Sequence, residues 1–205
     1  MNRAHRHFAA TCLAAAVVTA CGRDDPEPTP PAPTTVNLTA APTGVRWQRF
    51  QGVNLPVTDQ GPHHTDGPAA TGYDHTPAGA AIAAIQATIR MSVATDTQWA
   101  QIGHRMLASG AGRDAWATAR AQISITTPAA DGAPTVLGYQ ITHYTDTAVD
   151  IAIYSALSDS SRTRNNTHVV WQADDWRLQL TAEPATNRVE AITDLPAGVV
   201  ALPAA

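Results

Sequence analysis

The chain of 205 residues contains no lysine and only two cysteines, Cys12 and Cys21. Its positive charge comes entirely from arginine, and thirteen arginines against seventeen acidic residues give a formal net charge of −4. Proteins that bind nucleic acid, or that attach to anionic membranes by charge, usually carry a basic stripe or cluster. The charge balance therefore predicts no nucleic-acid partner and no polybasic membrane patch.

The common catalytic motifs are also missing. The sequence has no Gly-x-Ser-x-Gly nucleophile elbow, no His-Glu-x-x-His zinc motif and no phosphate-binding loop. The sequence accordingly predicts no catalytic residue, no metal site and no cofactor, and we expect the protein not to be an enzyme.

Long hydrophobic runs are absent apart from one of thirteen residues, from Phe8 to Ala20, which follows the basic residues Arg3 and Arg6. A membrane-spanning helix needs about 20 apolar residues, so this run is typical of a cleaved export signal. The signal ends in Val-Thr-Ala-Cys, which resembles a bacterial lipobox with Cys21 as the lipidated residue.

An alternative interpretation of the same segment stays open, because Val-x-Ala also fits ordinary signal cleavage, which would release a soluble protein. Cys12 leaves with the signal, so Cys21 would be the one cysteine of the mature chain. A lone unmodified thiol is unusual in an exported protein, whereas an acylated cysteine is expected at this place. We therefore predict a lipid-anchored protein on the extracytoplasmic face of the cell membrane.

The composition divides the chain into three parts. Residues 1–20 are the predicted lipoprotein signal peptide, and residues 21–43 are the lipidated cysteine followed by a linker. Six prolines lie in residues 22–43, with few residues that could enter a core, so this segment is expected to act as an extended stalk. Residues 44–205 are predicted to form a single globular α+β domain.

Within that domain, helical periodicity comes first and strand periodicity second. Helices are predicted over 77–92, 97–108 and 113–123, the first beginning at Thr76-Pro77 and carrying an apolar stripe of Ile82, Ile85 and Ile89. After Pro128 apolar residues alternate, which predicts four antiparallel strands and a short fifth near 199–202. Residues 45–50 could be a short strand or an arm, and residues 52–74 are expected to be a long irregular loop.

The expected fold is thus α+β, with N-terminal helices packed on a curved four- to five-stranded antiparallel sheet. Three stretches give it a recognisable signature: residues 47–62, the sequence Gly-Tyr-Asp-His-Thr-Pro-Ala-Gly-Ala at 72–80, and Trp-Gln-Ala-Asp-Asp-Trp-Arg-Leu at 171–178. Together they resemble a family of uncharacterised actinobacterial exported lipoproteins associated with conjugative and mobile elements. The helix-then-sheet order is similar to the nuclear transport factor 2-like, or cystatin-like, cone. The resemblance implies an assembly role at the cell envelope and supplies no catalytic residues.

One cluster of the sequence contains metal-ligand residue types, namely His63, His64, Asp66, Asp74 and His75. Neighbouring histidines point apart on an extended chain, and Gly-Pro steps leave the spacing unconstrained. Asp and Thr at these places are also common in turns and helix caps. We interpret the cluster as structural and predict no metal site.

Asp174 and Asp175 could form a pair of catalytic carboxylates, but they lie between two strands, where Asp favours a hairpin turn. Cone-shaped domains also host isomerases that use Asp or His with Tyr. The candidates for that role are Tyr139, Asp150 and Tyr154. Asp150 and Tyr154 fall opposite the apolar stripe of the same strand, so they are expected to face solvent.

Three functional hypotheses follow. The first is a non-enzymatic structural or assembly component at the cell envelope, held by its lipid anchor and contacting other envelope proteins, in a conjugation or type IV secretion-like system. The second is a small-molecule-binding lipoprotein that uses the mouth of the cone. The third, least favoured, is an isomerase-like enzyme on the same cone.

Overall fold

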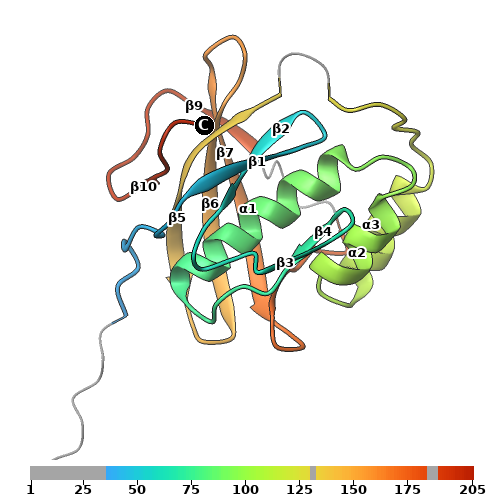
Figure 1. Cartoon of the computed structure of the whole chain (residues 1–205), viewed down its shortest axis with the longest axis horizontal. Coiled ribbons are helices and arrows are strands. Elements are labelled where there is room, and N and C mark those ends of the chain that lie inside the picture. Colours follow the sequence, from blue (N-terminus) through green and yellow to red (C-terminus); the bar gives the residue numbers. More distant parts are fainter. Residues whose placement is uncertain (1–35, 130–132, 184–188) are drawn as a thin grey trace, which may run out of the picture. The chain divides into compact units, whose positions relative to one another are not determined.

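A computed structural model describes residues 36–129, 133–183 and 189–205 of the chain (Figure 1). Residues 36–205 form one compact unit with its own hydrophobic core. The predicted signal peptide, the lipidation site Cys21 and most of the predicted linker lie outside the described residues.

Four short strands precede the helices. They are β1 (Arg46–Phe50), β2 (Val53–Val57), β3 (His64–Asp66) and β4 (Ala69–Thr71), paired as two antiparallel hairpins. The expected irregular loop over 52–74 is therefore wrong, and so is the expectation that helices come first. Gly52 and Gly67 have φ of 89° and 55°, and each lies in the turn of one hairpin, where positive φ favours glycine.

Three helices follow, at α1 (Pro77–Val93), α2 (Trp99–Met106) and α3 (Ala111–Arg120). Their number and approximate positions confirm the sequence prediction. The hydroxyl oxygen of Thr76 accepts a hydrogen bond of 3.1 Å from the backbone N–H of Gly79, and Pro77 occupies the first turn. This is the cap that the Thr-Pro pair predicts.

The main sheet has six strands rather than four or five. They are β5 (Thr135–Tyr144), β6 (Ala148–Ala156), β7 (Arg162–Trp171), β8 (Trp176–Leu178), β9 (Val189–Ile192) and β10 (Val200–Ala201). The order is β10-β5-β6-β7-β8, all antiparallel, and β9 also pairs with β7. The short β8 pairs with residues 169–171 of β7, and β9 pairs with residues 162–165 of the same strand.

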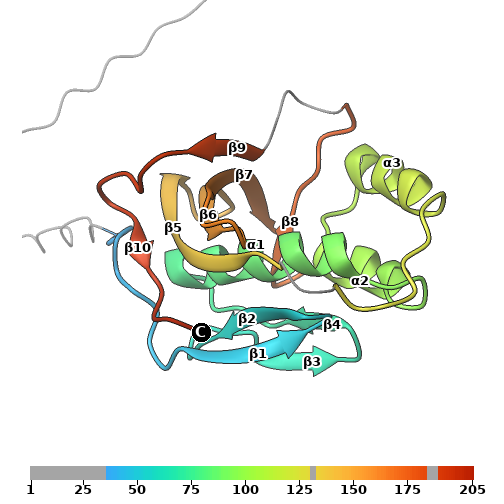
Figure 2. The same cartoon turned by 90° about the horizontal axis from the view of Figure 1, so that it is seen from above.

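Helix α1 lies between the main sheet on one side and the two N-terminal hairpins on the other (Figure 2). Ile82 and Ile85 are fully buried, as the predicted stripe requires. The alanines on the other sides of the helix are also buried, and they include Ala80, Ala81, Ala83, Ala84 and Ala87. A helix packed on both sides needs small residues all around, which explains the alanine-rich sequence of α1.

Candidate functional site

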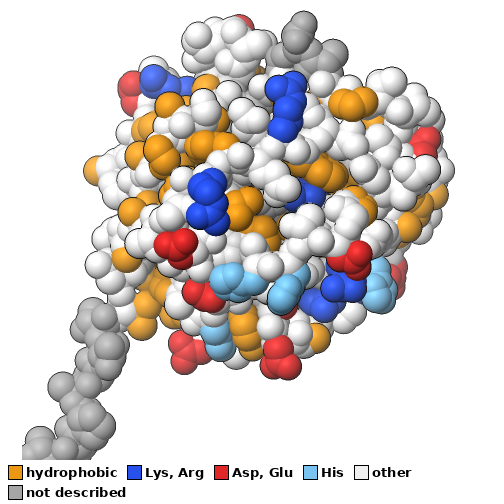
Figure 3. Space-filling model, in the orientation of Figure 1, with side chains coloured by type: hydrophobic (Ala, Val, Ile, Leu, Met, Phe, Trp, Pro, Cys, Tyr) orange, Lys and Arg blue, Asp and Glu red, His pale blue; other side chains and the backbone are white. Residues whose placement is uncertain are grey.

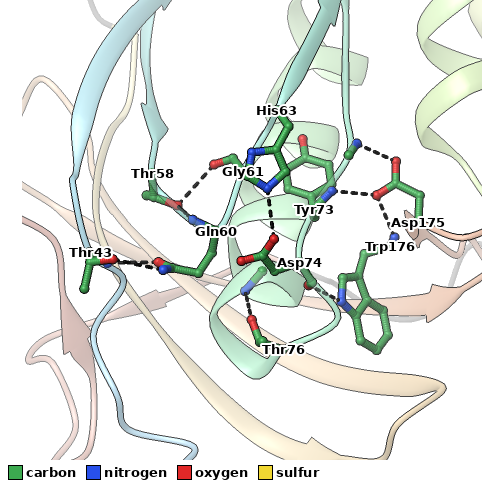
Figure 4. A network of polar contacts seen from close by, with 12 residues as sticks. Thr43, Thr58, Gln60, Gly61, His63, Tyr73, Asp74, Thr76, Asp175 and Trp176 are labelled. Atoms are coloured by element: carbon green, nitrogen blue, oxygen red, sulfur yellow. Dashed lines mark hydrogen bonds and ion pairs between the residues drawn. The ribbon is translucent and has the colours of Figure 1, made fainter.

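The three signature stretches of the sequence meet at one end of α1 (Figure 4). Asp175, the residue immediately before β8, is 8% exposed, and its carboxylate accepts three backbone hydrogen bonds. The donors are the N–H groups of Gly72 at 2.8 Å, Tyr73 at 3.0 Å and Trp176 at 3.0 Å. Asp175 thereby joins the β7–β8 hairpin to the segment that leads into α1.

The two neighbouring aspartates have different roles. Ala173 and Asp174 both have positive φ, and Gln172 N–H bonds the carbonyl of Asp175 at 2.9 Å, so the predicted hairpin turn is present. Asp174 is exposed at the tip of the turn, whereas Asp175 is buried and saturated by backbone donors. The arrangement explains this aspartate pair as a structural device.

Two tryptophans continue the junction. Trp176 donates its indole N–H to the backbone carbonyl of Asp74 at 3.1 Å. The imidazole of His75 stacks on the ring of Trp171, with centroids 3.8 Å apart and an interplanar angle of 9°. Gly79 completes the contact, because a Cβ at that position would overlap the carbonyl of Asp74. The signature residues therefore serve to lock α1 against the hairpin.

The histidine-rich cluster is dispersed over this junction. His63 pairs with Asp74, with Nε2 to Oδ1 at 2.9 Å, and both side chains are nearly half exposed. The imidazole of His75 instead hydrogen-bonds the backbone carbonyl of Asp146 in the β5–β6 turn. Among the described residues, no group of three His, Cys, Asp or Glu side chains is placed to hold a metal ion. Histidine and acidic side chains also gather along the lower rim of the face drawn in Figure 3.

The three isomerase-type candidates do not converge on one site. Tyr139 is fully buried on the helix side of the sheet, opposite Ile153, and burial raises the pKa of its phenol to about 12. Tyr154 follows Ile153 in β6 and so points to the other face. Asp150 is half exposed and pairs with His168, Oδ1 to Nδ1 at 2.6 Å.

The expectation that Tyr154 faces solvent is wrong, since the residue is only 1% exposed. Its hydroxyl donates to Gln140 Oε1 at 3.2 Å, and Gln140 Nε2 donates to the carbonyl of Ala197 at 3.3 Å. The chain that leads into β10 thus contacts the side chains of this face. Strand alternation alone could not anticipate that cover, because it comes from a segment more than forty residues away.

A different feature has the form of a binding site. Between the C-terminal half of α1 and the sheet lies a half-open hollow of about 270 Å³. Residues of α1, β6, β7 and β9, with two from the adjoining loops, line it: Thr88, Ile89, Ser92, Val93, Pro134, Ile153, Ser155, Leu157, Thr163, Asn165 and Val189.

A second hollow of about 180 Å³ adjoins the first and shares Thr88, Ser92, Asn165 and Val189 with it. Its remaining lining residues are Met91, Asn166, Thr167, Leu178 and Leu180. We call the two hollows together the α1–β7 trough.

The chemistry of the α1–β7 trough is uniform. None of its described lining residues is charged, titratable or aromatic. Its wall contains two of the five large hydrophobic residues that are exposed in the described chain. They are Leu157, 39% exposed, and Val189, 53% exposed. Such a site can bind by apolar burial and neutral hydrogen bonds, but these side chains supply no ready acid, base or thiol.

Sequence reasoning missed this site because its walls come from elements far apart in the chain. Ile89 belonged to the predicted apolar stripe of α1, but β9 was not predicted. A further hollow of about 170 Å³ lies between α2 and α3, beside Trp99 and Trp116, whose rings meet edge to face at 5.9 Å.

The sequence model of one domain family, described as a domain of unknown function (DUF8175), matches residues 10–201. The chain belongs to this family. The match covers the whole described fold up to β10 and extends into the predicted export signal, including Cys21. No curated protein and no solved structure matches the chain.

Proposed function

We propose that this protein is a lipoprotein anchored through Cys21 to the extracytoplasmic face of the cell membrane, where its domain acts as a non-enzymatic assembly component. Its partners are other envelope proteins, in a conjugation or type IV secretion-like apparatus. The observation that carries this proposal is the α1–β7 trough, an apolar, uncharged surface site whose described lining contains no titratable group.

The anchor is supported by the sequence around Cys21 and by the extent of the family match. The match starts at residue 10 and therefore includes the apolar run and the lipobox-like segment. No helix in the described ranges is long and apolar enough to cross a membrane. The two or three acyl chains of a lipoprotein cysteine would hold the protein firmly, because each buried CH₂ contributes about 0.8 kcal/mol.

The likeness to the nuclear transport factor 2-like cone is part of the proposal. A sheet that curves around one central helix, as in Figure 2, supports that likeness. The actinobacterial origin is likewise proposed, on the signature stretches and on the complete absence of lysine.

A second candidate function is the binding of a small molecule in the same trough. Its larger hollow, at about 270 Å³, is close to the lower end of the usual range for ligand pockets, about 300–1,000 Å³. The half-open form of the site favours a partner that lies along the surface over a ligand that is enclosed.

The anchor and the assembly role can be tested together in cells that naturally make the protein. Cells are fed an alkyne-tagged fatty acid, and the wild-type protein is compared with Cys21→Ala. We expect the label and the membrane association only in the wild type, and cross-links to exported proteins that are lost in the variant. An unlabelled mature chain that begins at an unmodified Cys21 would contradict the anchor. Measurable turnover that vanishes on mutation of Tyr139 or Asp150 without loss of stability would contradict the non-enzymatic role.

A further inference from the structure

We propose that the α1–β7 trough binds an extended, uncharged peptide segment of a partner protein, with apolar side chains two positions apart entering its two hollows. This inference rests on the proposed function and deepens it, because it names the site and the chemistry of the partner.

The absence of charged residues from the described lining of the trough restricts the class of ligand. A buried charge without a partner is costly, and none of the described lining residues of either hollow could neutralise one. The segment that enters must therefore be free of Asp, Glu, Lys and Arg at the positions that are buried. Phosphates and nucleotides, whose charged groups would have to enter the trough, are disfavoured for the same reason.

The polar part of the lining separates a peptide from a hydrocarbon. Five of the eleven residues around the larger hollow carry a hydroxyl or an amide: Thr88, Ser92, Ser155, Thr163 and Asn165. The hydroxyl of Ser92 already donates to the backbone carbonyl of Thr88 at 2.8 Å, and that of Thr88 is itself buried. A hydrocarbon chain would leave the side chains of Ser155, Thr163 and Asn165 without hydrogen-bond partners, whereas a peptide backbone offers one donor and one acceptor per residue. Neutral sugars usually stack on aromatic rings, and the described lining has none.

The adjacency of the two hollows suits an extended chain. Along a strand, side chains alternate between the two faces, so residues i and i+2 point the same way at roughly 6.6 Å apart. The two hollows adjoin and share four lining residues, as two pockets for such alternate side chains would. A cavity of about 150 Å³ already holds a benzene ring, so hollows of about 270 and 180 Å³ each have room for a Leu or Phe side chain.

Asn165 is placed to hydrogen-bond the peptide backbone between those two side chains. It lines both hollows, and no hydrogen bond of its carboxamide is found within the described part of the chain. A carboxamide can donate and accept at once, which matches an amide group of an extended backbone. The hydroxyl of Thr88 is also buried without a partner among the described residues.

The test uses residues 36–205, the compact unit that contains the core, and two blocked pentapeptides as probes. In acetyl-Thr-Phe-Thr-Leu-Thr-amide the apolar residues are two apart; in acetyl-Thr-Thr-Phe-Leu-Thr-amide they are adjacent. Titrations are followed by the amide chemical shifts of ¹⁵N-labelled protein. We expect shifts at Ser92, Asn165 and Val189, and a Kd at least tenfold lower for the first peptide.

Two variants locate the binding. Val189→Asp puts a charge at the wall of the trough, and Ser92→Trp fills it; both positions are exposed, so both variants should keep the melting temperature. Each variant should raise the Kd of the first peptide at least tenfold. Leu195→Asp is the matched control, because Leu195 is an exposed apolar residue at 37% that does not line the trough, and it should leave the Kd unchanged.

Absence of shifts in the trough, or equal affinity for the two peptides, would overturn the inference. The inference would also be overturned if neither peptide binds while n-decanol binds and is weakened by Val189→Asp. That outcome would assign the trough to a small apolar ligand. These results do not depend on lipidation, so a failure here is distinct from a failure of the membrane anchor.

Discussion

Replacing Asp175 by alanine should destabilise the domain strongly, because it removes the acceptor that ties the β7–β8 hairpin to the segment before α1. The carboxylate accepts hydrogen bonds from the backbone N–H groups of Gly72, Tyr73 and Trp176, and it is buried. Truncation leaves these donors without an acceptor, and a buried donor without a partner costs about 1–3 kcal/mol. Since water can reach part of the space that is vacated, we expect a total loss of about 3–5 kcal/mol in the free energy of unfolding.

The isosteric change Asp175→Asn gives a sharper form of the same prediction. One carboxylate oxygen serves Tyr73 and Trp176 and the other serves Gly72. An amide can replace one of the two oxygens, but its NH₂ group then faces a backbone donor. The loss should fall to about 1–3 kcal/mol.

The assay is urea and thermal unfolding of residues 36–205 followed by circular dichroism. For a domain of this size, 1 kcal/mol corresponds to roughly 2–4 °C, so Asp175→Ala should lower Tm by roughly 6–20 °C. Asp174→Asn is the control, because Asp174 is exposed and its φ of 56° suits Asn. If the free energy of unfolding of Asp175→Ala lies within about 0.5 kcal/mol of that of the control, the carboxylate does not hold the junction and the reasoning is refuted.

Three further predictions concern stability. Ile85→Ala should lower the free energy of unfolding by about 2–5 kcal/mol in urea titrations, because Ile85 is fully buried; an unchanged midpoint would place it at the surface. Hydrogen bonding, first of all from the Ile125 N–H, lowers the pKa of Asp96 below its ordinary 3.8. The ionised Asp96 carboxylate therefore stabilises the fold above pH 3.8, and this stabilisation is lost as the pH falls through the lowered pKa. Asp96→Asn should make the free energy of unfolding fall less steeply with decreasing pH in the acid range. An equally steep fall in the variant would contradict this. Tyr154→Phe removes the bond to Gln140 and should cost about 0.5–1.5 kcal/mol, whereas a surface-facing tyrosine would give no change in Tm.

The sequence was informative where local rules and tertiary packing agree. Thr76-Pro77 fixes the start of α1, and isoleucines three and four positions apart fix its buried face, so both were predictable. The β7–β8 turn was predictable for a similar reason, since Asp174 tolerates the left-handed backbone that the turn requires.

The N-terminal hairpins were not predictable from the same rules. β4 is buried at all three positions and β3 is exposed at all three, so neither has the alternation that marks a strand. β9 is exposed or half-buried throughout and is held by pairing with β7. Gly52 and Gly67 are equally typical of irregular loops, and nothing local to them shows that they form the turns between short strands.

The candidate site was the least predictable feature. The wall of the α1–β7 trough includes Val189 of β9, a strand that the sequence does not predict, and the C-terminal residues of α1 that face β6 and β7. Conversely, the residues with chemically suggestive side chains, such as Asp175 and His75, are engaged in holding elements together. Their spacing in the sequence could not distinguish a structural junction from a reactive centre.

The central claim is that the domain holds a partner at the membrane through the α1–β7 trough. The most direct measurement places a photo-cross-linking amino acid at position 189, or at position 195 as a control, in the full chain within intact cells. The account predicts an adduct from position 189 to an exported envelope protein, mapped to an uncharged segment with alternating apolar residues. That adduct should be absent from position 195 and lost in Cys21→Ala. Equal adducts from both positions, or an adduct that survives loss of Cys21, would contradict it.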